Sequence, residues 1–144
     1  MTSLKTLWFL GLLAVFAFSG CANFSAWLRR YTYPPSFNYI TAEQLRSTMW
    51  QLARDVRELE KTLREPGDIG EQRRAEMIRL LVSMDDKAAR LNSRGRRSNH
   101  PMIDAHLPTF RQDILLARQG VEKSNYALVG LLPGACVYCH GAAH

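Results

Sequence analysis

The stretch that sets the fold class is TAEQLRSTMWQLARDVRELEKTLRE, residues 41–65. It opens with a capping box, in which the Thr41 side chain can accept a hydrogen bond from the backbone of Gln44 while the Gln44 side chain reaches back. Apolar residues then recur at steps of four and three, which places them on one face of an α-helix. They are Leu45, Met49, Leu52, Val56, Leu59 and Leu63. Pro66 and Gly67 end the pattern, so the sequence predicts a helix over 41–65 with one buried face.

Three later segments carry the same helical period. The second contains Met77, Leu81, Met84, Ala88 and Leu91, and ends at the polar residues 92–95. The third contains Ile103, Leu107, Phe110, Ile114, Ala117 and Val121. For the third helix we expect Asn99 as the N-cap and Pro101 in the first turn, with a kink or a restart at Pro108. The fourth, over residues 125–142, contains Tyr126, Val129, Leu132 and Cys136, and is weakened in its first half by Gly130, Pro133 and Gly134.

The composition agrees with a single globular domain. The chain has 144 residues, of which 47% are hydrophobic and 22% charged, and this excludes disordered and collagen-like classes. Four amphipathic segments joined by short connections predict an all-α fold, an antiparallel four-helix bundle over residues 41–144.

The first twenty residues are typical of an export signal. Lys5 precedes an uncharged apolar run over 7–18, which is too short to span a membrane comfortably. The sequence Phe18-Ser19-Gly20-Cys21 resembles a bacterial lipoprotein signal. The resemblance implies cleavage before Cys21, a lipid on its sulfur, and anchoring on the periplasmic side of a membrane, the outer membrane more than the inner. An ordinary signal peptide and an uncleaved anchor are the alternatives. Residues 21–40, with Pro34-Pro35, are interpreted as a tether.

The chemistry is concentrated in Cys136-Val137-Tyr138-Cys139-His140, the pattern of covalent c-type haem attachment. Residues three and four apart share a helix face, so Cys136 and Cys139 can both bond to the edge of one haem. His140 can then serve as the proximal iron ligand. Two alternatives are a thiol redox centre and a zinc site. The zinc site lacks a second cysteine pair, and only His106 or His144 could complete it.

A helical domain with this motif in its last helix resembles the cytochrome c-prime family, the four-helix class II cytochromes c. The resemblance covers residues 41–144 and includes Met49-Trp50 in the first helix. Pro133 and the ending Gly141–His144, which lacks a basic residue, depart from the family pattern. The family implies one covalent haem c and either one-electron transfer or binding of nitric oxide or carbon monoxide.

The sixth iron position has several candidate ligands. They are Met49, Met77, Met84, Met102, His100 and His106. Met77 and Met84 lie on the second apolar stripe, where core packing explains them, and His100 suits a surface cap. For His106, which precedes Leu107 and Pro108, exposure to solvent is the alternative to iron binding. Met49 is the strongest candidate, because in an antiparallel bundle the start of the first helix lies beside the end of the last, where His140 sits.

These observations predict a membrane-anchored monohaem electron carrier. The alternatives are a gas-binding haem protein and a structural haem-bearing subunit of a larger complex. No Ser/His/Asp set, phosphate loop or paired carboxylates indicate an enzyme. The net charge of +6 suits an acidic redox partner or anionic lipid, whereas nucleic acid is not expected for an exported lipoprotein. A homodimer is also possible.

Overall fold

The computed structural model describes residues 28, 32–33, 37–92 and 97–141. Residues 38–144 form one compact unit, and its described part is helical without any strand, which confirms the all-α prediction. The elements are α2 (Ala42–Arg64), α3 (Glu71–Leu91), α4 (Pro101–Glu122), the 3₁₀ helix η2 (Val129–Leu131) and α5 (Leu132–Gly141). None of the helices in the described ranges is long and apolar enough to cross a membrane. The predicted signal segment 1–20 and Cys21 lie outside the described residues.

The start of α2 confirms the predicted capping box. The Gln44 amide donates to Thr41 Oγ1 at 3.1 Å, and the Thr41 amide donates to Gln44 Oε1 at 3.0 Å. The helix ends at Arg64, one residue short of the prediction, with Glu65 as its C-cap.

The start of α4 differs from the prediction. His100, and not Asn99, is the N-cap residue, and no side chain caps the helix. Asn99 instead pairs with Ile40, whose amide donates to Asn99 Oδ1 at 2.8 Å and whose carbonyl accepts from Asn99 Nδ2 at 2.9 Å. The prediction was wrong because spacing along the chain does not show a polar side chain's distant backbone partners.

Pro101 lies in the first turn of α4, as predicted. Of the two outcomes predicted at Pro108, the restart does not occur and the kink stays a prediction. Helix α4 runs through Pro108 to Glu122 without a break. Pro108 is solvent-exposed and has no backbone N–H to donate to the carbonyl of Asp104, four residues earlier.

The last helix is shorter than predicted. Residues 125–131 form turns and η2, so only 132–141 of the expected 125–142 are in α5. The chain turns sharply after α4: the Asn125 amide donates to the Gly120 carbonyl at 2.8 Å, and Ser124 has a φ of 58°. A side chain at Gly120 would place its Cβ 2.6 Å from the Asn125 carbonyl oxygen, so this close turn needs glycine.

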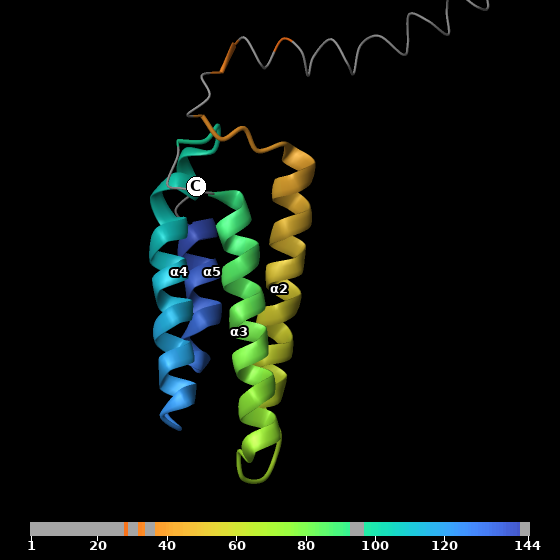
Figure 1. Ribbon diagram of the computed structural model, residues 1–144, viewed down its shortest axis with the longest axis vertical. Coiled ribbons are helices and arrows are strands. Elements are labelled where there is room, and N and C mark those ends of the chain that lie inside the picture. The colour runs from red at the N-terminus through yellow and green to blue at the C-terminus, as the bar shows by residue number, and fades with distance from the viewer. Residues whose placement is uncertain (1–27, 29–31, 34–36, 93–96, 142–144) are drawn as a thin grey trace, which may run out of the picture. The chain divides into compact units, whose positions relative to one another are not determined.

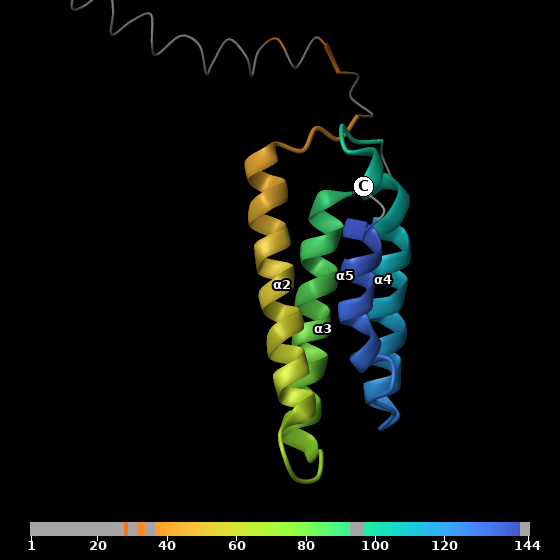
Figure 2. The same ribbon diagram turned by 180° about the vertical axis from the view of Figure 1, so that it is seen from behind.

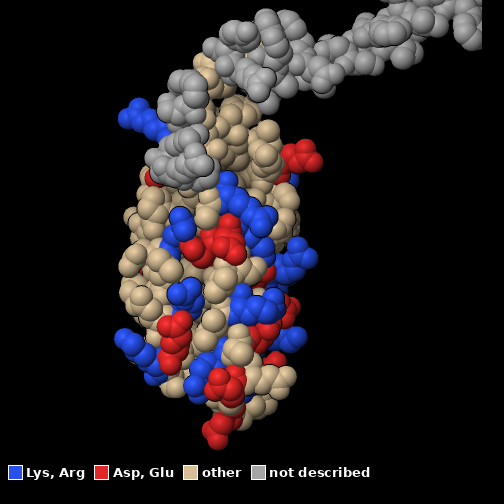
Figure 3. Space-filling view, viewed as in Figure 1, with Lys and Arg blue, Asp and Glu red and all other residues tan. Residues whose placement is uncertain are grey.

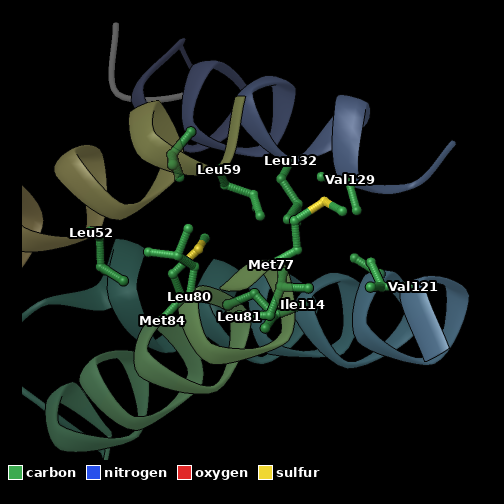
Figure 4. Packing of buried hydrophobic residues seen from close by; sticks show 12 residues of the cluster. Leu52, Leu59, Met77, Leu80, Leu81, Met84, Ile114, Val121, Val129 and Leu132 are labelled. Carbon is green, nitrogen blue, oxygen red and sulfur yellow. The ribbon is translucent and has the colours of Figure 1, made fainter. Parts of the chain in front are cut away.

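The helices lie side by side in a bundle-like arrangement, with α3 packed against both α2 and α4 (Figures 1 and 2). The larger core cluster joins all four helices, and in Figure 4 Met77 lies among Leu132 and Val129 of the C-terminal segment. Met77 and Met84 are fully buried there, as expected for core side chains. A smaller cluster contains Ile40, Ala88, Leu91, Ile103 and Leu107.

Ionic contacts tie α3 to both neighbouring helices. Lys87 of α3 pairs with the buried Asp55 of α2, which also accepts from Ser83 Oγ at 3.2 Å. On the other side, Arg111 of α4 holds Asp85 through Nε at 2.7 Å and Nη2 at 3.2 Å. Elsewhere positive and negative side chains are interspersed, as Figure 3 shows for one face.

The chain that leads into α2 is bound to the loop before α4. The Asn38 amide donates to the Arg97 carbonyl at 2.9 Å, and Asn38 Nδ2 donates to the Leu91 carbonyl at 2.7 Å. Ile40 is buried in the smaller cluster. The last three residues of the predicted tether, 38–40, therefore pack as part of the helical unit.

Candidate functional site

A cavity of about 440 Å³ lies between α4 and α5, with Met49 contributed by α2. Its wall is mostly apolar: Ile103, Leu107 and Phe110 come from α4, and Leu131, Leu132 and Ala135 from the C-terminal segment. Leu131 at the rim is 68% exposed, so the cavity opens to solvent beside it. Its size and lining are those of a small-molecule or cofactor site.

The cavity lies where the two clusters of the hydrophobic core meet. Met49 and Phe110 are the half-buried side chains that pack against both core clusters and also line the cavity. Beyond them, α5 contributes one buried residue, Leu132, and its remaining side chains do not fill the space against α4. The cavity therefore lies alongside the outer part of α5, which carries the cysteine motif.

Helix α5 holds the whole motif in helical backbone, which places Cys136 and Cys139 one turn apart. Cys139 lines the cavity, and the half-buried Cys136 packs against the larger core cluster. Both are free thiols. His140 is exposed and does not line the cavity, because it follows Cys139 by about 100° around the helix.

Burial raises the pKa of the Cys136 thiol, and the neighbouring Cys139 adds to the shift. Reactive cysteines of thiol redox centres have the opposite property, a lowered pKa that keeps the nucleophilic thiolate at neutral pH. The environment of Cys136 therefore favours a protonated, slowly reacting thiol.

Of the predicted distal candidates, two line the cavity, Met49 and His106. The structure does not support the alternative that His106 simply faces solvent. Its ring is half-buried and meets the edge of Tyr138, with ring centroids 5.4 Å apart. The missed signal is its position three residues after Ile103 and four before Phe110, which puts it on the inward face of α4.

The other candidates lie away from the cavity. Met102 is half-buried outside the lining, and His100 Nε2 lies 3.2 Å from the Ile40 carbonyl oxygen. Within the described ranges, no three His, Cys, Asp or Glu side chains gather as a metal-binding group. His144, named for the zinc alternative, lies outside them.

The residues fit a covalently attached haem in part, since Cys139 lines the cavity whereas Cys136 and the exposed His140 do not. Two thiols one helical turn apart lie at or beside an apolar cavity, and aromatic side chains, Phe110 and Tyr138, form part of its wall. Comparisons with known proteins add nothing to this assignment: no family model matches the chain, and no curated protein or solved structure matches it.

Proposed function

We propose that the protein is a membrane-anchored monohaem c-type cytochrome that carries single electrons, without enzymatic activity of its own. The observation that carries the proposal is the position of the cysteine motif on α5. Cys136 and Cys139 lie one turn apart on a helix that borders an apolar cavity, and the raised pKa of Cys136 disfavours thiol chemistry.

Different side chains of this site would bind different parts of the haem. Cys136 and Cys139 would form its two thioethers, and His140 would bind its iron. Ile103, Leu107 and Phe110 would exclude water from its faces. The haem, once bound, supplies a reversible one-electron couple.

The exposed position of His140 is compatible with this role because little of α5 is fixed by packing. Leu132, at the start of the helix, is its one buried residue. Cys136 packs against the larger core cluster and Cys139 lines the cavity, so the second half of the helix would have to turn about its axis for His140 to face the same group. Bonding at two positions would then hold the imidazole of His140 to the group.

The proposal includes the finer features of the fold and the location. The short connections 65–70 and 92–100 support an antiparallel four-helix bundle of the cytochrome c-prime type. Cys21 carries the lipid, which places the domain on the periplasmic side of the membrane. An acidic redox protein is the expected partner, since the chain has a net charge of +6.

Mass spectrometry of the denatured protein, produced in a host that attaches c-type haem, tests this proposal. We expect one haem to remain bound to the peptide that contains Cys136 and Cys139. Cys136→Ser and Cys139→Ser should each lose one thioether and give unstable holoprotein. Cys21→Ser is the matched control: it should keep the haem and leave the membrane fraction. A C-terminal peptide with two free thiols would refute the proposal.

A further inference from the structure

The wall of the cavity between α4 and α5 carries a negative charge. Among the described residues, Asp113 is the one side chain of this wall with a formal charge, and no Lys or Arg lines the cavity. The other polar side chains of the wall carry no formal charge, and they are His106, Thr109, Tyr138 and Cys139. The chain as a whole has a net charge of +6, so the cavity differs in sign from the rest of the protein.

Asp113 lies half-buried in the middle of α4, and within the described ranges it has no basic partner. Both arginines of α4 are engaged elsewhere. Arg111 pairs with Asp85 of α3, and Arg118 Nε lies 3.4 Å from Glu122 Oε1. A carboxylate beside an apolar surface is partly desolvated, so a cation that binds next to it gains more than it would in bulk water.

Three solvent-exposed leucines line the same cavity, on both sides of the turn that follows α4. They are Leu116, which is 40% exposed, Leu128, which is 39% exposed, and Leu131, which is 68% exposed. Leu116 follows Asp113 by three residues and therefore lies on the same face of α4. Apolar surface in contact with water costs free energy, and an apolar ligand in the cavity would cover it.

This carboxylate is separated from the cysteine motif along α4. His106 contacts Tyr138, the neighbour of Cys139, with ring centroids 5.4 Å apart. Asp113 follows His106 by seven residues, which is about 10 Å along the helix axis. A ligand that binds Asp113 therefore does not require the Cys139 thiol.

We propose that the cavity binds a small lipophilic amine, an apolar molecule with one ammonium group, at Asp113. The ammonium would donate to the Asp113 carboxylate, and the apolar body would lie against Phe110 and the three leucines. A ligand with a carboxylate would instead bring a second negative charge to Asp113. This inference goes beyond the proposed function, because it concerns a second ligand and does not depend on an attached haem.

The test compares three probes with the same apolar body and different head groups. They are phenylbutylamine, phenylbutanol and phenylbutyrate, titrated at neutral pH into the purified full-length protein in a calorimeter. We expect the amine to bind about fivefold more tightly than the alcohol, because an ion pair with a half-buried carboxylate adds a modest free energy. Phenylbutyrate should bind most weakly. Equal affinities for the amine and the alcohol would overturn the proposal.

Three variants locate the site. Asp113→Asn keeps the shape of the side chain and should abolish the preference for the amine, with binding of the alcohol unchanged. Asp86→Asn, the matched control, removes an exposed carboxylate of α3 outside the cavity lining and should keep the preference. Ala135→Leu fills part of the cavity and should weaken binding of both probes, with circular dichroism to verify folding. A preference that survives in Asp113→Asn, one that is lost in Asp86→Asn, or unchanged binding in folded Ala135→Leu would each refute the assignment.

Discussion

Helices α3 and α5 differ in how much of their surface the fold uses. Helix α3 lies between α2 and α4 and buries six residues, whereas α5 buries one, Leu132. Val137 and Tyr138 of α5 are 72% and 70% exposed. The polypeptide alone explains why α3 is in place, because its apolar side chains fill the core. It gives α5 much less to pack against, because Leu132 is the one buried residue of that helix.

The charges separate the same two regions. No Asp, Glu, Lys or Arg occurs after Lys123, so all formal charge lies before the C-terminal segment that contains η2 and α5. Ion pairs join α3 to both neighbours through Lys87–Asp55 and Arg111–Asp85. The C-terminal segment has no Asp, Glu, Lys or Arg that could form such ion pairs, so it is held by apolar contacts instead.

A matched pair of leucine truncations should show the largest difference between the two regions. Leu81→Ala in α3 removes a fully buried side chain and should lower the free energy of unfolding by about 3 kcal/mol. Leu131→Ala, next to α5, should lower it by less than about 0.5 kcal/mol, because this leucine is 68% exposed. Urea denaturation of the haem-free protein measures both. Equal losses would contradict the contrast between α3 and α5.

Removing an ionic tie of α3 should have the next largest effect. Asp55→Ala leaves Lys87 largely buried without its partner and should cost about 2 kcal/mol, by the same measurement. Asp85→Ala breaks a more exposed pair with Arg111, so we expect a loss of about 0.5 kcal/mol. If Asp55→Ala and Asp85→Ala lower the free energy of unfolding equally, burial does not determine how much these two ion pairs stabilise the protein.

The cap of α2 should contribute less. Thr41→Ala removes the side chain that accepts from the Gln44 amide and should destabilise the protein by about 1 kcal/mol. Thermal unfolding followed by circular dichroism can detect this loss. Ser47→Ala, at an exposed position within the same helix, serves as the control and should change stability very little.

The smallest effect is the pH dependence of the Cys136 thiol. Its pKa is raised in the folded protein, so the protonated thiol is favoured and the resulting stabilisation is present below the ordinary thiol pKa. This contribution disappears as the pH rises through the raised value. In haem-free Cys21→Ser/Cys139→Ser protein, alkylation of Cys136 should reach half of its maximal rate above the ordinary thiol pKa. The same chain in urea should titrate normally, and identical profiles would show that burial has no influence.

The apolar period predicts most of the fold because burial of α2, α3 and α4 depends on residues within each helix. Thr41 and Gln44 predict a start, and Pro66 predicts an end, by local chemistry alone. The predictions for Asn99 and for the first half of the fourth segment were wrong, because these positions depend on residues outside the helix. Asn99 binds Ile40, 59 residues away, and the turn at Asn125 depends on the Gly120 carbonyl. The cysteine motif can be found from spacing, but the inward position of His106 requires the register of α4 against α5.

The link between residues 38–40 and the loop before α4 has a mechanical consequence for a lipid-anchored chain. If Cys21 is fixed in a membrane, the 17 residues from there to Asn38 can span at most about 60 Å, and any pull along them reaches the domain at Asn38. There the load is shared by bonds to Arg97 and Leu91 before it reaches the first turn of α2. Tension from the membrane would thus be borne at the end of α3, and the helix that supplies Met49 would remain unstretched.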